Sequence, residues 1–377
     1  MRVQTSSRAQ ILRELHFRCQ ALAANDNRGF KQEFEELNEV GKDLPTRAGD
    51  SGANREKNRY PYILPYDHCR VRLSIQNSHP HTDYINANFV PGGGSERDFI
   101  CTQGPMHSTM ADFWRMVWEQ NVRIIVMVTA LRHKDILLCD KYWPLERGTV
   151  HHGLIQVTTV TRKQGPDYFI TTINLRQRDC PADRMITHYY YPSWPDRGIP
   201  KDSFSLCVFT NHVRQHLESI PRLGPAVVHC SAGVGRSGTF VSLLWLMQLC
   251  ARGIQPDIRA AVEDLRLHRM WMVQNLEQYI FVHWCLLQWL SGGAGGSSAC
   301  SPQIQGASSN INHHIQDQPH SSSGWGDRTA RRRHRRHRQK PPPDPPQSTI
   351  QQILHPGNLL RRLLPSSSLF NPSSHTS

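Results

Sequence analysis

The most informative stretch of the sequence reads GPAVVHCSAGVGRSGTF, from Gly224 to Phe240. A short apolar strand at 226–229 runs into a glycine-containing turn, and the turn runs into an apolar helix. This order of elements points successive backbone N–H groups and the positive end of the helix dipole at one spot, which makes an anion cradle suited to a phosphate. Cys230 opens the loop and Arg236 closes it.

Cys230 is placed for nucleophilic chemistry on a bound anion. A free thiol has a pKa of ~8.5, whereas thiols at helix N-termini and beside cations ionise at ~3.5–7.5. A helix terminus alone supplies ~0.3–2 kcal/mol, so we expect the loop amides, the Ser237 hydroxyl and the Arg236 charge to lower the pKa of Cys230 further. The glycines that permit the tight turn and a close approach of backbone to ligand are Gly233, Gly235 and Gly238. The competing interpretation is a buried structural cysteine beside an ordinary turn, and the strand, glycines, arginine and helix in register argue against it.

Composition divides the chain into three parts. Residues 291–377 show no sustained apolar periodicity and contain ten Lys and Arg against three Asp and Glu, more than half of the net charge of +13. This composition predicts a disordered, basic, Pro/Ser-rich tail. Residues 30–290 are long enough to bury one large core, and residues 1–29 are predicted to form a helical lead-in.

Hydrophobic patterning over 1–290 predicts strands flanked by helices. Two helices are expected before the core, the second capped near Asn25 to Asn27. Strands are expected at 71–73, 84–89, 99–102, 124–129, 142–144, 154–160, 168–173, 185–191 and 226–229. Further helices are expected at 109–120, 204–217, 238–250, 258–267 and 276–290. This order argues for an α/β fold with a mixed sheet.

Cysteine usage and hydropathy exclude two classes of protein. Ten cysteines in 377 residues, with no Cys-x-x-Cys pair, are too sparse for a disulfide framework. The expected state is reduced thiols in a reducing compartment. The first residues lack the apolar region of a signal peptide, and no apolar run approaches the ~20 residues of a membrane span. A soluble, cytoplasmic chain is therefore expected.

Residues 226–240 closely resemble the signature loop of the protein tyrosine phosphatases, and the likeness extends over roughly 30–290. Other stretches that resemble motifs of the family are Lys57-Asn-Arg-Tyr60, Asp83-Tyr-Ile-Asn-Ala-Asn88, Thr102-Gln-Gly-Pro105, Asp112-Phe-Trp114 and Trp194-Pro-Asp196. The stretch 30–44, FKQEFEELNEVGKDL, is most similar to the segment before the catalytic domain of receptor-type members with a single phosphatase domain. The resemblance implies a central, highly twisted mixed β-sheet flanked by helices, and a lead-in like a juxtamembrane segment.

The resemblance also implies a reaction, the hydrolysis of phosphotyrosine in proteins through a cysteinyl-phosphate intermediate. The Cys230 thiolate would attack phosphorus, Arg236 and the loop N–H groups would hold the oxygens, and Asp196 would protonate the leaving phenolate. In the second displacement Asp196 would act as the base. Gln274 would position the water, with Gln278 nearby at the substrate.

Further residues receive roles from the same resemblance. Tyr60 would stack on the substrate ring and make the cleft deep enough for phosphotyrosine but too deep for phosphoserine. His229 would pack beneath the loop and help to set the pKa of Cys230, and Ser237 would stabilise the departing thiolate. The loop residues that would bind the phosphate are Ser231, Ala232, Gly233, Val234 and Gly235. No metal or cofactor is expected, because the cradle supplies the positive field.

Several positions depart from the family's pattern. His133 and Leu138 stand where the family usually has a Glu that braces the signature arginine and a Lys that contacts the acid loop. The other departures are Tyr62, Arg197, Trp271 and Asn275. They predict altered peptide selectivity and a turnover reduced by roughly tenfold or more, at ~1.4 kcal/mol per decade.

Three alternatives compete with an active tyrosine phosphatase. The first is a phosphotyrosine-binding module that captures a phosphopeptide without turning it over. A dual-specificity phosphatase is disfavoured, because the 57–60 loop predicts a deep cleft. Nucleic-acid binding as the main function would leave the phosphatase motifs unexplained.

The tail carries its own candidate motifs. Arg331 to Arg338 form a basic run that could bind an anionic partner such as nucleic acid, anionic lipid or an import receptor. Pro341 to Pro346 satisfy a Pro-x-x-Pro spacing suited to an SH3 domain. The competing interpretation is a solvated tail without a partner. If the chain is part of a receptor, its catalytic domain is expected on the cytoplasmic side of the membrane, and the sequence predicts no oligomeric state.

Overall fold

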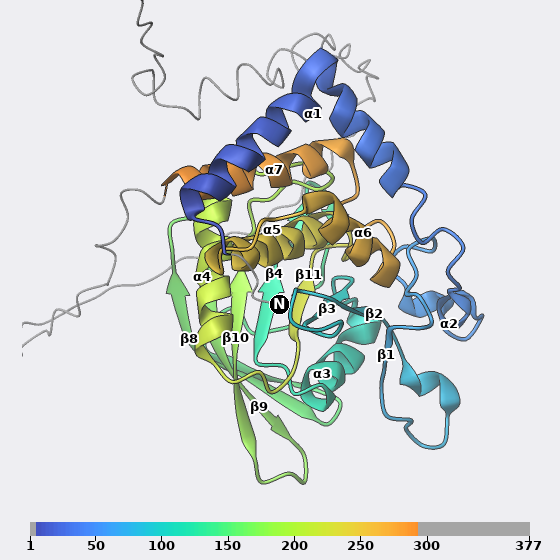
Figure 1. Cartoon of the computed structure of the whole chain (residues 1–377). Helices are drawn as coiled ribbons and strands as arrows, with labels where there is room; N and C mark the ends of the chain where they lie inside the picture. Colours follow the sequence, from blue (N-terminus) through green and yellow to red (C-terminus); the bar gives the residue numbers. More distant parts are fainter. Residues whose placement is uncertain (1–4, 293–377) are drawn as a thin grey trace, which may run out of the picture. The chain divides into compact units, whose positions relative to one another are not determined.

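The computed structural model describes residues 5–292, which are built around a nine-stranded, twisted mixed β-sheet (Figure 1). The strand order is β1-β2-β3-β11-β4-β10-β9-β8-β7. The strands are β1 Arg70–Arg72, β2 Tyr84–Val90, β3 Phe99–Thr102, β4 Ile124–Met127, β7 Gly148–His152, β8 Ile155–Gln164, β9 Phe169–Gln177, β10 Asp183–Tyr190 and β11 Ala226–His229. A separate two-stranded ribbon pairs β5 (Arg132–His133) with β6 (Ile136–Leu137).

The four central strands β3, β11, β4 and β10 run parallel, and the outer strands pair antiparallel. All four residues of β11 are buried, as expected for a strand covered on both faces. Parallel strands end at the same edge of a sheet, where ligands of open α/β folds bind. The segments that follow Thr102, Met127, Tyr190 and His229 therefore come together.

Helices cover both faces of the sheet. The helix α3 (Met110–Glu119) packs against β7 and β8, whereas α5 (Gly235–Ala251) packs on β11 and α6 (Ile258–His268) on β2. Side chains alternate along a strand, so Ile125 and Val227 join the apolar cluster around α3. The helices α4 (Ser203–Ser219) and α7 (Leu276–Ser291) pack with α5, and α1 lies along α7 (Figure 1). Shorter helical turns are α2 Arg47–Asp50, η1 Arg55–Lys57, η2 Pro80–Asp83 and η3 His107–Thr109.

The structure confirms most of the predicted elements, including two helical segments before the core. They form α1 (Arg8–Leu37), which is interrupted at Ala24 to Asn27. Asn25, Asp26 and Asn27 adopt left-handed φ angles of 52°, 59° and 62°. Asn and Asp tolerate this region better than most residues, so they form the joint between the segments.

One predicted strand was wrong and three were missed. Residues 142–144 are not a strand: Tyr142 is fully buried, and its carbonyl accepts a 2.9 Å hydrogen bond from Trp114 Nε1 of α3. The missed strands are β5, β6 and β7, which are short and lack a buried residue.

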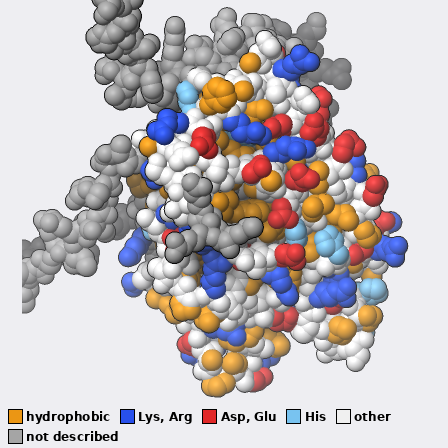
Figure 2. Space-filling view, in the orientation of Figure 1, with side chains coloured by type: hydrophobic (Ala, Val, Ile, Leu, Met, Phe, Trp, Pro, Cys, Tyr) orange, Lys and Arg blue, Asp and Glu red, His pale blue; other side chains and the backbone are white. Residues whose placement is uncertain are grey.

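The predicted tail, with its basic run and prolines, lies outside the described residues, and the division at residues 29 and 290 stays a prediction. Among residues 5–292, no helix combines the length and apolarity needed to cross a bilayer. The nine cysteines of this part of the chain are free thiols. On the face in Figure 2, acidic and basic side chains are interspersed.

His283 is a buried histidine at the contact between α1 and α7. Its ring lies 4.9 Å from the rings of both Phe30 and Tyr279, and its Nδ1–H donates to the Tyr279 carbonyl at 2.9 Å. Within residues 5–292, Nε2 has no hydrogen-bond partner. Burial lowers the pKa of His283 from 6.5 to about 4.

This depressed pKa predicts a loss of stability in mild acid. Between pH 6.5 and about 4 the unfolded chain binds a proton at His283 that the folded chain does not, so the free energy of unfolding falls as pH falls through this window. At pH 5 the loss from this one group is about 2 kcal/mol. The variant His283→Leu is expected to lose about 2 kcal/mol less than the wild type between pH 7 and pH 5 in urea unfolding. If wild type and His283→Leu lose the same free energy of unfolding between pH 7 and pH 5, the acid sensitivity belongs to other groups. The same conclusion holds if a control variant of exposed His151 is protected as much as His283→Leu.

Candidate active site

Cys230 follows β11 and lies beneath the N-terminus of α5, with 2% of its surface exposed. Its sulfur accepts a 3.2 Å hydrogen bond from the Gly233 N–H. Gly233 has a φ of +74°, and a Cβ there would lie 2.1 Å from the Thr102 carbonyl oxygen. At Gly238 a Cβ would lie 2.4 Å from the Val273 amide nitrogen. The close approach at both glycines is thus to neighbouring backbone, which differs from the expected approach to ligand.

Arg269 fixes the direction of the loop, and its sequence context did not predict this role. Its buried guanidinium donates to the carbonyls of Ala232 and Gly233 at 3.0 and 2.9 Å. The same group donates to the side-chain oxygens of Asn86 and Asn88 on β2, at 2.9 and 3.0 Å. Because Arg269 binds these carbonyls, the loop carbonyls point toward Arg269 and the Gly233 amide points toward the sulfur of Cys230. Two asparagines inside a fully buried strand were the available signal, since each needs a hydrogen-bonding partner.

Opposing influences act on the pKa of Cys230. Burial raises it, while the charge of Arg236 and hydrogen bonds from Ser237 and the Gly233 N–H lower it. The net effect is a pKa below the ordinary value, which favours the thiolate. The Ser237 hydroxyl lies outside standard hydrogen-bond geometry, and no other atom of residues 5–292 pairs with it.

His229 lies under the loop at the end of a buried hydrogen-bonded chain. Its Nδ1 is 3.0 Å from the Cys230 carbonyl, which can only accept, so Nδ1 carries the proton. Burial lowers the pKa of His229 to about 4, which keeps the ring neutral and makes Nε2 an acceptor. The Tyr142 hydroxyl, 2.7 Å away, therefore donates to His229 and accepts from His188 Nε2, also at 2.7 Å. The hydrogen bond from His229 therefore holds the Cys230 carbonyl in place, and Tyr142 orients the His229 ring.

Arg236 connects the signature loop to two other segments. Its Nη2 forms a 2.7 Å ion pair with Asp196, whose side chain is 39% exposed. Its Nη1 donates to the Thr129 hydroxyl at 2.9 Å and to the Trp194 carbonyl at 3.2 Å. The predicted acid and the predicted phosphate-binding arginine are thus in direct contact.

The segment around Asp196 is also held from α7. Asn275 caps α7 by accepting from the Gln278 N–H, and its Nδ2 donates to the Arg197 carbonyl at 2.9 Å. Gln278 Nε2 donates to the Gly198 carbonyl at 3.3 Å. Asn275, a departure from the family pattern, therefore anchors the acid loop.

The two predicted glutamines differ in their surroundings. Gln278 is fully buried; besides its bond to Gly198, its Oε1 accepts from the Gln274 N–H at 2.9 Å. Its amide is engaged at both ends, so in this conformation it braces neighbouring segments and is not presented to a substrate. The Gln274 side chain lies beside Gly235, with Oε1 2.9 Å from where a Cβ would stand. It therefore borders the loop that holds Cys230.

Tyr60 forms one wall of the site through a 2.6 Å hydrogen bond between its hydroxyl and the Ser231 hydroxyl. The preceding Arg59 donates to the carbonyls of Gly104 and Pro105 at 3.1 and 2.9 Å and pairs with Asp140 at 3.0 Å. The structure thus joins the stretches 57–60 and 102–105, which were identified separately in the sequence.

Departures from the family pattern lie at different depths. His133 is exposed on the β5–β6 ribbon and Leu138 is buried. Neither is among the hydrogen-bond partners of Arg236 described above. Tyr62 and Trp271 are exposed, at 87% and 44%.

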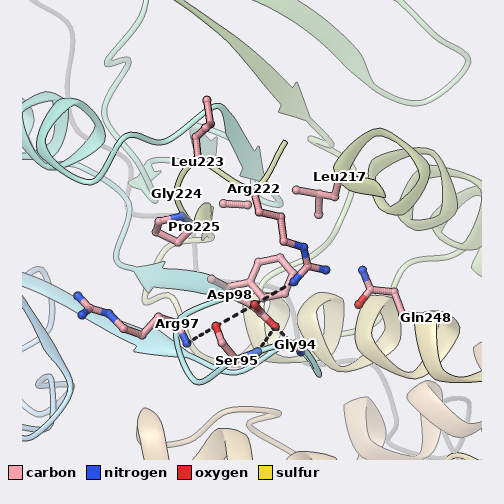
Figure 3. Close-up of a pocket in the computed structure, with 13 residues that line it drawn as sticks. Gly94, Ser95, Arg97, Asp98, Leu217, Arg222, Leu223, Gly224, Pro225 and Gln248 are labelled. Atoms are coloured by element: carbon pink, nitrogen blue, oxygen red, sulfur yellow. Dashed lines mark hydrogen bonds and ion pairs between the residues drawn. The ribbon is translucent and has the colours of Figure 1, made fainter. Parts of the chain in front are cut away.

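A cleft of about 400 Å³ lies at the other end of β11, bounded by Ala226 (Figure 3). The Asp98 carboxylate there accepts from the N–H groups of Gly94 and Ser95 and from Arg222, so its charge is already satisfied (Figure 3). This cleft is separate from the catalytic candidates, which gather at the carboxyl ends of the parallel strands. Within residues 5–292 no cluster of His, Cys, Asp and Glu suits a metal ion.

Comparison with known proteins agrees with this geometry. A family model described as "Protein-tyrosine phosphatase" matches residues 54–288. The chain is 42% identical over 283 residues to receptor-type tyrosine-protein phosphatase V of Rattus norvegicus, covering 75% of this chain and 16% of the relative. Identity to receptor-type tyrosine-protein phosphatase eta of Mus musculus is 40%, over 73% of this chain and 22% of the relative. Tyrosine-protein phosphatase Lar-like of Caenorhabditis elegans is 37% identical, over 81% and 13%. The chain thus spans less than a quarter of these relatives' length.

The role of Arg269 predicts a specific defect in Arg269→Lys. A lysine keeps the charge but cannot serve four acceptors in one plane. We expect the loop carbonyls to be released, the pKa of Cys230 to rise and the rate of Cys230 alkylation by iodoacetate at pH 6 to fall about tenfold. The exposed Arg252, at the end of α5, provides a control as Arg252→Lys. If the alkylation rate of Cys230 in Arg269→Lys varies with pH as it does in the wild type, the assigned role of Arg269 is wrong.

Proposed function

The chain belongs to the protein-tyrosine phosphatase family, and we propose that it hydrolyses phosphotyrosine in proteins through a cysteinyl-phosphate intermediate. The observation that carries the proposal is a buried cysteine with a lowered pKa at a helix N-terminus, next to an arginine that contacts an acid. Since the chain covers only 16–22% of the receptor-type relatives V and eta, activity, substrates and partners of the whole protein are part of the proposal.

In the first step the Cys230 thiolate forms a bond to phosphorus while the bond from phosphorus to the tyrosyl oxygen breaks. The Nε and Nη2 edge of Arg236 and the loop amides hold the three remaining oxygens, which gain charge in the transition state. Asp196 gives its proton to the departing phenolate. The contact of Asp196 with Arg236 places this carboxyl group beside the phosphate-binding group. To donate a proton, Asp196 must leave this ion pair and become protonated when the phosphate binds Arg236.

In the second step water attacks phosphorus and the sulfur–phosphorus bond breaks. Asp196, now a carboxylate, accepts the proton of the water, and the thiolate returns to the loop with inorganic phosphate released. Gln274, whose side chain borders the loop at Gly235, is our candidate for holding this water. Ser237 N–H and Gly233 N–H stabilise the departing thiolate, as they do in the resting site.

Substrate selectivity is proposed to depend on Tyr60. Its hydroxyl bond to Ser231 holds the ring upright beside the cradle, and the anchoring of Arg59 stiffens the loop that carries it. A phosphorylated side chain must reach past this wall to contact Cys230. The length of a tyrosyl side chain allows this reach, whereas a seryl side chain is too short.

Location and further partners are proposed on sequence grounds. We propose a cytoplasmic site of action, on the cytoplasmic side of a membrane if the chain is part of a receptor, because the cysteines of residues 5–292 are free thiols and the relatives are named receptor-type. For the tail we propose an SH3 domain or an anionic partner, from the prolines at 341–346 and the basic run at 331–338.

Phosphate release from a phosphotyrosyl peptide tests the main proposal. The wild type should show a Cys230-dependent burst in single-turnover experiments and steady release of phosphate. The variant Cys230→Ser should lower turnover by at least about 10³-fold, because the hydroxyl is a far weaker nucleophile at this pH. A phosphoseryl peptide should not be hydrolysed.

The control is Cys180→Ser, a partly buried cysteine away from the loop, which should keep wild-type turnover. If the wild type binds phosphopeptide as tightly as Cys230→Ser but releases no phosphate, the chain is a capture module and the proposed enzymatic function is wrong. Equal hydrolysis of the phosphoseryl peptide would reject the role of Tyr60.

A further inference from the structure

The hydrogen bonds of Arg236 define which edge of its guanidinium is available to a phosphate. A guanidinium has five N–H donors in a rigid plane. Nη1 uses its two on the Thr129 hydroxyl and the Trp194 carbonyl, and Nη2 uses one on Asp196. Within residues 5–292 this leaves the Nε–H and one N–H of Nη2 for a ligand. Nε and Nη2 form one edge of the guanidinium, which is the bidentate geometry for two oxygens of a phosphoryl group.

The orientation of this plane needs a fixed acceptor at Nη1. The family's usual brace is a carboxylate at the position of His133, and this chain has an exposed histidine there. Two acceptors remain at Nη1, the Trp194 carbonyl and Thr129. The Trp194 carbonyl belongs to the acid loop, so it is a fixed reference only while that loop stays in place.

Thr129 is fixed to the sheet. It follows β4 by two residues and is fully buried. The preceding Val128 N–H donates to the His229 carbonyl at 3.0 Å, which sets this segment beside the strand that ends at Cys230. Its hydroxyl hydrogen donates to the Ala130 carbonyl at 2.9 Å, so an oxygen lone pair is left for Arg236.

We propose that Thr129 is a positioning residue that holds Nη1 of Arg236 and thereby turns the Nε and Nη2 edge toward the substrate phosphate. The inference rests on the proposed function and adds a residue to it. Thr129 anchors the arginine to the sheet, whereas the hydrogen bond to the Trp194 carbonyl exists only while the acid loop is in place. Without the hydroxyl, one buried N–H of Nη1 loses its acceptor and the guanidinium is free to turn toward Asp196.

The test compares Thr129→Val, which removes the acceptor at similar size, with Thr129→Ser, which keeps it. A hydrogen bond to a charged group predicts that kcat/KM for a phosphotyrosyl peptide falls about 10- to 100-fold in Thr129→Val. The second readout is the protection of Cys230 by vanadate against alkylation with iodoacetate, which needs no turnover. The vanadate concentration for half protection should rise by a similar factor. Thr129→Ser should stay within about threefold of the wild type in both.

The matched control is Thr210→Val. Thr210 is fully buried on α4, and its hydroxyl has no partner within residues 5–292. This variant should leave turnover and vanadate protection unchanged. If Thr129→Val does not fold, Thr129→Cys provides a second variant, because a thiol is a weak acceptor of similar size.

The proposal is overturned if Thr129→Val has wild-type kcat/KM and wild-type vanadate protection. It is also overturned if Thr129→Ser is as defective as Thr129→Val, because the effect would then come from the methyl group and not from the hydroxyl. A wild type without turnover, whose vanadate protection still depends on Thr129, would reject the proposed function and retain the positioning role. Loss of turnover in Thr129→Val with unchanged vanadate protection would reject the positioning of the anion-binding edge.

Discussion

The site is built around a sulfur atom that has almost no contact with water and whose pKa is nevertheless lowered, which favours the thiolate. Removing a charge from water is expensive unless hydrogen bonds and opposite charges replace the solvent. The groups around Cys230 replace the solvent in this way: a helix N-terminus, the Gly233 N–H, Ser237 and Arg236 all favour the thiolate. A field of this kind, which favours a thiolate, is equally suited to a bound phosphoryl group.

Arg269 holds the same loop from beneath through the carbonyls of Ala232 and Gly233. Its four acceptors are two carbonyls and two asparagine side chains, all of them neutral. Its charge therefore has no carboxylate partner among these contacts; burial lowers the pKa of Arg269, and the nearby Cys230 opposes this shift. His229, in contrast, is kept neutral by burial and acts through a single hydrogen bond. The two buried groups under the loop thus both hold its carbonyls, Arg269 as a charged donor and His229 as a neutral one.

Local sequence was sufficient to predict the parts of the site that lie within one continuous motif. The strand, turn and helix around Cys230 obey rules of short range, so the placement of Arg236 and Ser237 beside Cys230 follows from the motif, while their catalytic roles stay a prediction. The placement of Arg269 and Thr129 does not follow from a motif, because their partners lie far away in the chain and arginines and threonines have many ordinary functions. The segment at 142–144 was misassigned for a related reason: an apolar, aromatic run suits a strand, but here Tyr142 turns its hydroxyl to two histidines.

The strand order has a consequence for synthesis of the chain. The strand β11 lies between β3 and β4, yet it is formed by residues 226–229, more than a hundred residues after β3 (Figure 1). Until a ribosome has released these residues, β3 and β4 cannot reach their native neighbour, and both present unpaired edges. Pairing of such distant segments is slow and exposes strand edges to other chains. The same late insertion means that Cys230 gains its cradle only when the sheet is complete, so a partly made chain carries an ordinary thiol.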